Sequence, residues 1–371
     1  MTSLLPPLPE APAARPGAVP PPGRHLLVLP EGVAPDEVEV LAASRFVSAR
    51  WERPPRVPSG RRATGAARGA APAPSAGVLR LGRLSTLTGP YALEPGQVAR
   101  WGLPTDARVA WVVDCPRERA TSPVFGGDRD GLRRAFGTDG PVREELRVVQ
   151  WLVAAARRLG GALRVEGGVV LEPEMDAALD LTVYSGRWVE PEAVLAAARR
   201  VDSRARLDVP TVPADPADPA GPATPQQTGA ALVARDRVGA GVADREERRR
   251  LHAEGDAFDA HMRRNPPPSE AFGLQIDLGV DGIVVVEVAV EAEPPMVLGA
   301  LDWARGEVVA YQVRWAAPDV EELESERPSL PHRVARGRAA RAVRSVAREV
   351  HAEVGGEIAD LAGFLVDPAD L

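Results

Sequence analysis

An internal repeat is the sequence feature that most constrains how this chain can fold. Residues 141–173 combine a helical apolar pattern, two glycines and a short apolar run that ends at Glu172-Pro173. A segment of the same plan returns near the C-terminus and ends at Asp367-Pro368. Because both copies keep the order helix, Gly-Gly, strand, the sequence predicts that one structural unit is present twice.

The helices of the two copies carry matching apolar stripes. Residues spaced i, i+3, i+7 and i+11 lie along one side of a helix. The stripe residues are Val148, Trp151, Ala155 and Leu159 in the first copy, and Val343, Val346, Val350 and Val354 in the second. Four arginines occupy the opposite side of the second helix, at about 100° per residue: Arg338, Arg341, Arg344 and Arg348. The pattern therefore predicts one helix with an exposed basic face, and a more deeply buried first helix because Val149 and Val153 widen its apolar surface.

The glycines and the upstream strands extend the match. Gly160-Gly161 and Gly355-Gly356 follow the two helices, where a left-handed residue usually ends a helix. Apolar runs at 109–113 and 309–313 precede them, each after a tryptophan and a turn. We therefore expect an α+β protein of two related halves, each ordered hairpin, helix, Gly-Gly, strand. A mixed sheet fits this order, and a ferredoxin-like arrangement is one form that such a sheet can take.

Proline, glycine and arginine divide the chain between these patterns. The chain has 38 prolines and 35 glycines in 371 residues, and most lie outside the periodic segments. The predicted segments are a disordered Pro-rich tail at 1–23, a short strand–helix segment at 24–52, a basic flexible linker at 53–77, a first half at 78–207, a Pro-rich linker at 208–243 and a second half at 244–371.

Composition excludes several classes of function. The chain contains no lysine, so all 45 basic residues are arginines and no Schiff-base, P-loop or kinase-type lysine is available. A single cysteine allows neither an internal disulfide nor a cysteine-rich zinc site. The net charge of −7 opposes general binding to nucleic acid. A start without a secretory pattern, and no long apolar run, predict a cytoplasmic protein that contacts no membrane; no cofactor is expected.

Three residues are weak candidates for catalysis. Glu172 and Asp367 occupy equivalent places in the repeat, so their carboxylates could face one another across a two-fold axis and share a raised pKa. Cys115 ends an apolar strand, but no histidine is tied to it by sequence. The alternative for the carboxylates is an acidic residue that ends a strand before proline, and for the cysteine an inert buried thiol.

Metal binding has one weak candidate cluster. His252, Asp256 and Asp259 share a face of a polar helix pattern. A solvated charged helix is the preferred interpretation, because a metal site would need converging ligands. Asp128 and Asp130 resemble the start of a calcium loop, but no residue completes that pattern.

The remaining candidates are two groups of arginines that could bind a partner. The basic arm has Arg53, Arg56, Arg61, Arg62 and Arg68 without an acidic residue among them, and the C-terminal helix adds its own arginine face. Arginine suits carboxylate and phosphate recognition, and an acidic stretch at 319–326 of another copy is one surface it could meet. We therefore expect a non-catalytic protein-interaction or scaffold protein. The alternatives are an enzyme with a carboxylate-lined cleft between the halves, and nucleic-acid binding through 53–68.

Overall fold

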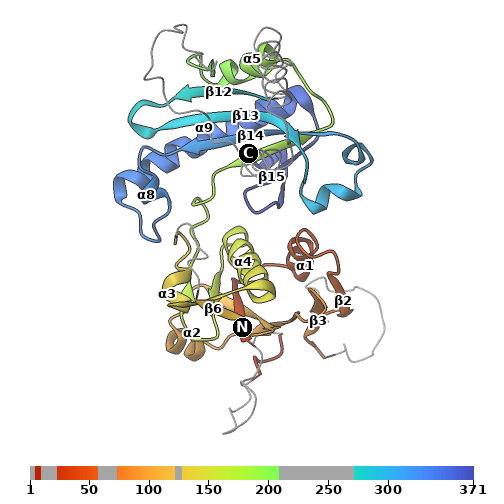
Figure 1. Cartoon of the computed structure of the whole chain (residues 1–371). Helices are drawn as coiled ribbons and strands as arrows, with labels where there is room; N and C mark the ends of the chain where they lie inside the picture. Colours follow the sequence, from red (N-terminus) through yellow and green to blue (C-terminus); the bar gives the residue numbers. More distant parts are fainter. Residues whose placement is uncertain (1–4, 10–22, 57–72, 122–127, 209–270) are drawn as a thin grey trace, which may run out of the picture. The chain divides into compact units, whose positions relative to one another are not determined.

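The computed structural model describes residues 5–9, 23–56, 73–121, 128–208 and 271–371 (Figure 1). The chain divides into two compact units, one formed by Met1–Leu207 with Leu274–Leu371 and the other by Asp208–Gly273. The first unit contains nearly all of two large sheets, and the description below concerns this unit. The predicted linker 208–243 and the predicted metal cluster lie almost wholly outside the described residues.

Seven strands form the first sheet of the described part, in the order β2-β3-β4-β5-β1-β8-β9. Its strands are β1 (Gly23–Pro30), β2 (Arg50–Arg53), β3 (Gly77–Arg80), β4 (Thr86–Ala92), β5 (Ala107–Cys115), β8 (Ala162–Arg164) and β9 (Val170–Leu171). A separate pair consists of β6 (Arg119–Thr121) and β7 (Asp139–Pro141). The long helix α4 (Arg143–Arg158) packs on the central strands of this sheet.

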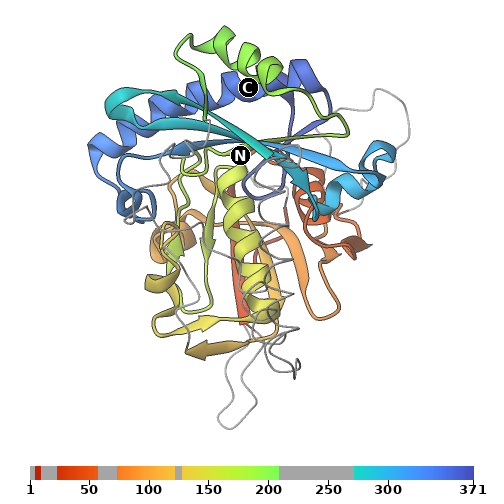
Figure 2. The same cartoon turned by 45° about the horizontal axis from the view of Figure 1, so that its top comes forward.

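The second sheet also has seven strands among the described residues, in the order β11-β12-β13-β14-β10-β15-β16. They are β10 (Leu181–Ser185), β11 (Arg206–Asp208), β12 (Ala271–Asp277), β13 (Ile283–Glu291), β14 (Val308–Ala316), β15 (Glu357–Asp360) and β16 (Leu365–Val366). Two helices, α5 (Pro191–Val201) and α9 (Leu330–Val354), pack together on one face of it (Figure 2). The architecture is therefore α+β, with antiparallel sheets.

Short helices connect the strands. They are α1 (Pro35–Ala43), α2 (Pro95–Trp101), α3 (Leu132–Phe136) and α8 (Val320–Leu323), with the 3-10 turns η1 (Gly279–Asp281), η2 (Met296–Ala300), η3 (Asp302–Arg305) and η4 (Pro368–Asp370). Within the described residues, no helix is long and apolar enough to cross a membrane.

The two sheets have the same strand order when their strands are counted along the chain. In each sheet the first strand lies between the strand that precedes the long helix and the strand that follows it. Val28 of β1 lies opposite Ala110 and Ala162, and Tyr184 of β10 lies opposite Ala310 and Glu357. The first strand of each sheet therefore has neighbours in equivalent positions.

The glycine pairs allow a close approach that a larger residue would prevent. Gly160 and Gly355 have φ of +63° and +71°, in the left-handed region that favours glycine. A Cβ on Gly161 would lie 2.3 Å from the carbonyl oxygen of Val28, and one on Gly356 would lie 1.9 Å from that of Tyr184. The second glycine of each pair thus lets the chain leave the helix and pair directly with the first strand of its sheet.

The buried faces of the long helices match the predicted stripes. Val148 and Trp151 of α4 are fully buried in the core of the first sheet, and Val149 and Val153 are buried beside them. The indole Nε1–H of Trp151 donates to the carbonyl of Leu41 at 2.9 Å, which ties α4 to α1. Each buried apolar side chain of this kind contributes roughly 1.5–3 kcal/mol before chain entropy is subtracted.

The predicted limits of the halves differ from the observed sheets. Strand β1 lies inside the first sheet, between β5 and β8, whereas the sequence predicts a first half at 78–207. Strand β10, inside that range, is central in the second sheet. The segment 78–87 forms parts of two strands, because the backbone N–H of Leu81 donates to the carbonyl of Ser85 at 3.0 Å and closes a turn between β3 and β4. The sequence of a short apolar strand does not specify its partner strand. The extent of each sheet therefore depends on pairing between strands that are far apart in the sequence.

Candidate functional site: the arginine face of α9

Helix α9 is a 25-residue element whose two ends are set by local sequence. The Ser329 hydroxyl accepts the backbone N–H of His332 at 3.4 Å, and Pro331 follows in the first turn. At the other end, the N–H of Gly355 bonds to the carbonyl of His351 at 2.8 Å. Val343, Val346, Val350 and Val354 are buried against the sheet. This packing fixes which side of the helix faces outward.

The outward side carries the four predicted arginines, and all four are exposed. Arg338 lies 3.2 Å from a carboxylate oxygen of Asp281, and Arg348 donates to the carbonyl of Leu371 at 2.6 Å. Arg341 and Arg344 make no ion pair with any residue that the structure describes. Guanidinium groups pair with carboxylates in a planar two-bond geometry, so this face is suited to an acidic surface.

The basic arm is only partly described. Arg53 is exposed at the end of β2, and Arg56 pairs through its backbone with Ser75. Arg61, Arg62 and Arg68 lie outside the described residues. The structure therefore brings together the arginines of α9 but does not place the arm as a set.

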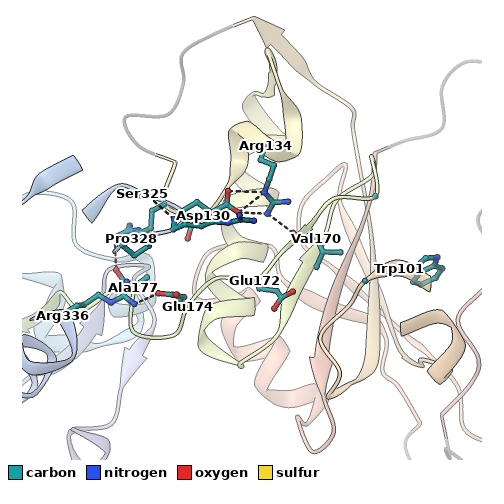
Figure 3. A pocket seen from close by; sticks show the side chains of 15 residues that line it. Trp101, Asp130, Arg134, Val170, Glu172, Glu174, Ala177, Ser325, Pro328 and Arg336 are labelled. Carbon is teal, nitrogen blue, oxygen red and sulfur yellow. Dashed lines mark hydrogen bonds and ion pairs between the residues drawn. The ribbon is translucent and has the colours of Figure 1, made fainter. Parts of the chain in front are cut away.

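A charged pocket of about 490 Å³ lies beside the start of α9 (Figure 3). Its lining contains as many carboxylates as guanidiniums: Asp130, Glu172, Glu174 and Glu326 with Arg129, Arg134, Arg327 and Arg336. Histidine, cysteine and lysine are absent from its lining. The pocket is therefore close to neutral and lacks the side chains that most often transfer protons near neutral pH.

Most of the charged side chains that line the pocket form ion pairs. Arg134 donates to Glu326 at 2.6 Å through Nη2 and at 3.0 Å through Nε. The nearly buried Arg336 pairs with Glu174 and lies 2.9 Å from Asp176. The first pair joins the loop after α8 to α3, and the second joins the start of α9 to the segment that follows β9.

Glu172 and Asp367 lie in different surroundings. Glu172 lines the charged pocket, while the carboxylate of Asp367 accepts the N–H of Ala369 at 2.9 Å and caps the last 3-10 turn. Both residues follow the last strand of their sheet, as the repeat predicts. No contact between the two carboxylates is present in the structure.

Cys115 is buried at the end of β5. Burial, reinforced by the charges of Glu145 and Glu144, raises the pKa of its thiol to about 12. A thiol with this pKa is almost entirely protonated near neutral pH, which opposes a role as nucleophile.

A buried ionic cluster beside Cys115 was missed by sequence reasoning. The carboxylate of Glu145, fully buried, accepts from Arg119 at 2.7 and 2.5 Å and from the N–H of Glu118 at 2.8 Å. His25, also fully buried, has Nε2 at 3.4 Å from Glu145 and accepts the N–H of Glu166 at Nδ1. The available signal was that Glu145 falls three residues before Val148 on the apolar stripe of α4.

The two nitrogens of His25 face partners other than the thiol. Nδ1 accepts a backbone N–H at 3.3 Å and Nε2 faces the Glu145 carboxylate, so neither nitrogen is available as a base for Cys115. Burial opposes ionisation of Glu145, but hydrogen bonds from His25, Arg119 and Glu118 outweigh it and hold its pKa below the usual value. The cluster is therefore arranged to keep a charge buried and paired.

In the described part of the chain, no group of three or more His, Cys, Asp or Glu side chains is arranged to hold a metal ion. His252, Asp256 and Asp259 lie outside the described residues. In the loop that resembles a calcium site, Asp128 accepts the N–H of Arg133 at 2.8 Å and Asp130 pairs with Arg157.

Comparisons with known proteins identify no relative. No family model matches the chain, and neither the curated proteins nor the solved structures contain a match to it.

Proposed function

We propose that this protein is a non-catalytic partner-binding protein, and that the arginine face of α9 recognises an acidic segment of another protein. The observation that carries the proposal is a row of four exposed arginines on one side of a helix whose other side is anchored in a sheet. From Arg338 to Arg348 the row spans about 15 Å at 1.5 Å per residue, the reach of a short peptide.

Rigidity supports the same proposal. The valines of α9 are buried, so its backbone is already ordered before any partner arrives. Binding would therefore require no ordering of the α9 backbone, and this lowers the entropic cost of association. Arg341 and Arg344, which have no ion pair among the described residues, would form their first such contacts with the partner.

We also propose that the two sheets descend from one duplicated unit. Their shared strand order, matching registers and glycine-ended helices support this origin. The seven-stranded sheets are larger than a ferredoxin-like unit, and the ferredoxin-like arrangement remains a prediction. The cytoplasmic location also remains a prediction. The second copy differs from the first in carrying the basic helix face, which fits a scaffold that gained a binding surface after duplication.

The enzyme alternative has less support. The carboxylates of the charged pocket lie among an equal number of guanidiniums, and Cys115 has a raised pKa. The nucleic-acid alternative depended on 53–68, of which most arginines lie outside the described residues. The arginine face of α9 could also meet a phosphate backbone, so the experiment below includes DNA as a competing probe.

The proposal is tested with a fluorescent glutamate-rich peptide and the full chain. Fluorescence anisotropy should show binding that weakens with added salt. The double variant Arg344→Glu/Arg348→Glu should weaken binding by at least about tenfold, because two charge-assisted contacts are replaced by repulsion.

A matched control separates the position of the charges from their number. Arg187→Glu/Arg305→Glu makes the same change of charge at two exposed arginines outside α9 and should bind the peptide as the unmodified chain does. Equal weakening by both variants would contradict the proposal. Preferential binding of a duplex DNA probe would favour the nucleic-acid alternative instead.

A further inference from the structure

A buried histidine lies in the first turn of α9. His332 is 7% exposed, and its ring packs against the indole of Trp315 in β14 with ring centres 5.1 Å apart. The ring nitrogen Nε2 is buried and has no hydrogen-bond partner among the described residues. Buried polar atoms are nearly always hydrogen-bonded, so this exception requires a physical explanation.

The surroundings of His332 favour its neutral form. The ring is removed from water, and the guanidinium of Arg336, which is also buried, lies one helical turn further along α9. His332 is also the third residue of α9, where the positive end of the helix dipole disfavours a cation. Burial first, and then the charge of Arg336, hold the pKa of His332 below its ordinary value of 6.5.

The acidic residues around the ring are bound to other groups. Glu322 of α8 accepts the N–H of Ser329 at 2.6 Å, and Asp319 accepts two backbone N–H groups as the N-cap of α8. Their charges favour the protonated ring, but burial and Arg336 outweigh them. The acidic residue of η1, Asp281, pairs with an arginine further along α9. None of these three carboxylates bonds to the buried Nε2.

The first turn of α9 is held by different contacts from the rest of the helix. At its start, the bond from Ser329 to Glu322 ties the helix to α8. Further along, Val343 and Val346 are fully buried against the second sheet. Helix ends open at a lower free-energy cost than buried helix centres, so the first turn can separate while the remainder stays folded. Separation would return the ring of His332 to water, where its charged form is solvated.

We propose that His332 makes the start of α9 a pH-sensitive switch: when the ring gains a proton, it leaves Trp315 and the first turn of α9 separates from α8. The closed form is favoured fully above pH 6.5, and this preference is lost as the pH falls through the pKa of His332 in the folded protein. The inference does not depend on the recognition of an acidic segment, because the arginines tested there, Arg344 and Arg348, lie beyond this turn.

Hydrogen exchange of the full chain, followed by mass spectrometry at about pH 7.5 and about pH 5, tests the proposal. After correction for the intrinsic exchange rate at each pH, peptides from 319–333 should exchange faster in acid. The expected increase is up to about tenfold for each pH unit by which folding lowers the pKa of His332. Peptides from 340–354 should keep their protection, because buried valines hold that part of the helix.

Two matched variants separate His332 from other groups that titrate in this range. His332→Phe keeps an aromatic ring against Trp315 but cannot take up a proton, so its exchange in 319–333 should be the same at both pH values. His351→Phe makes the same change at the other end of α9 and should retain the response of the unmodified chain. An acid response that is absent from the unmodified chain, or that persists in His332→Phe, would overturn the proposal.

An NMR titration of the histidine rings gives a second readout that needs no variant at position 332. The chain has five histidines. One ring resonance should titrate with a midpoint below pH 6.5, in the same pH range as the exchange step in 319–333. If every histidine ring titrates at pH 6.5 or above, the proposal is wrong.

Discussion

Glu145 and Arg119 form a two-bond ion pair in which the carboxylate is fully buried, with Arg119 Nε and Nη2 at 2.7 and 2.5 Å from its oxygens. The pair joins the first turn of α4 to β6 at the edge of the first core. A buried charge is tolerated only when it is paired and hydrogen-bonded, and here the N–H of Glu118 and the ring of His25 complete the arrangement.

Glu145→Gln should destabilise the fold strongly. The substitution keeps the shape of the side chain but removes the charge that balances Arg119, so we expect a loss of about 3–5 kcal/mol in the free energy of unfolding. Urea denaturation followed by circular dichroism measures this quantity. Glu52→Gln, in an exposed pair with Arg80, is the control and should cost about 1 kcal/mol or less; equal losses in the two variants would be inconsistent with a structural role for the buried pair.

The contribution of Glu145 should depend on pH in a defined direction. Its pKa in the folded protein is below the ordinary value of 4.5, because hydrogen bonds from His25, Arg119 and Glu118 outweigh the cost of burial. The stabilisation is therefore complete above pH 4.5 and is lost as the pH falls through the folded pKa. The difference in unfolding free energy between the unmodified chain and Glu145→Gln should shrink on acidification; a difference that grows instead would refute this sign.

Gly356→Ala should be among the most damaging small substitutions. Its Cβ would approach the carbonyl oxygen of Tyr184 to 1.9 Å, and the residue has φ of +87°. We expect a loss of about 3 kcal/mol or more, measured by thermal or urea unfolding. Gly337→Ala is the contrasting change, because Gly337 lies inside α9 with open space around it; it should stabilise the helix by about 1 kcal/mol.

Cys115 should resist thiol reagents in the native protein. Its thiol is buried and has a pKa of about 12, so the thiolate that reacts with a disulfide reagent is scarce near neutral pH. Labelling should be slow in buffer and rapid in denaturant, with one thiol released per chain. Rapid stoichiometric labelling of the folded chain would restore Cys115 as a candidate nucleophile.

The sequence predicted elements better than it predicted their partners. The apolar stripes of α4 and α9, their glycine ends and the exposed arginines were all predictable, because helical spacing and turn residues act over a few positions. The pairing of β1 with β5 and β8 could not be predicted from the sequence, and neither could the membership of β10 in the second sheet. The burial of Glu145 could have been suspected from its place on an apolar stripe, but its partner Arg119 is 26 residues away.

By itself, therefore, the sequence determined the periodic elements, their glycine ends and the basic side of the last helix, since these follow from spacing along one segment. Only the tertiary structure decided which strands share a sheet and which charges are buried in pairs. These outcomes depend on contacts between residues distant in sequence, and no local pattern specifies which of many compatible partners a strand or a charge will meet.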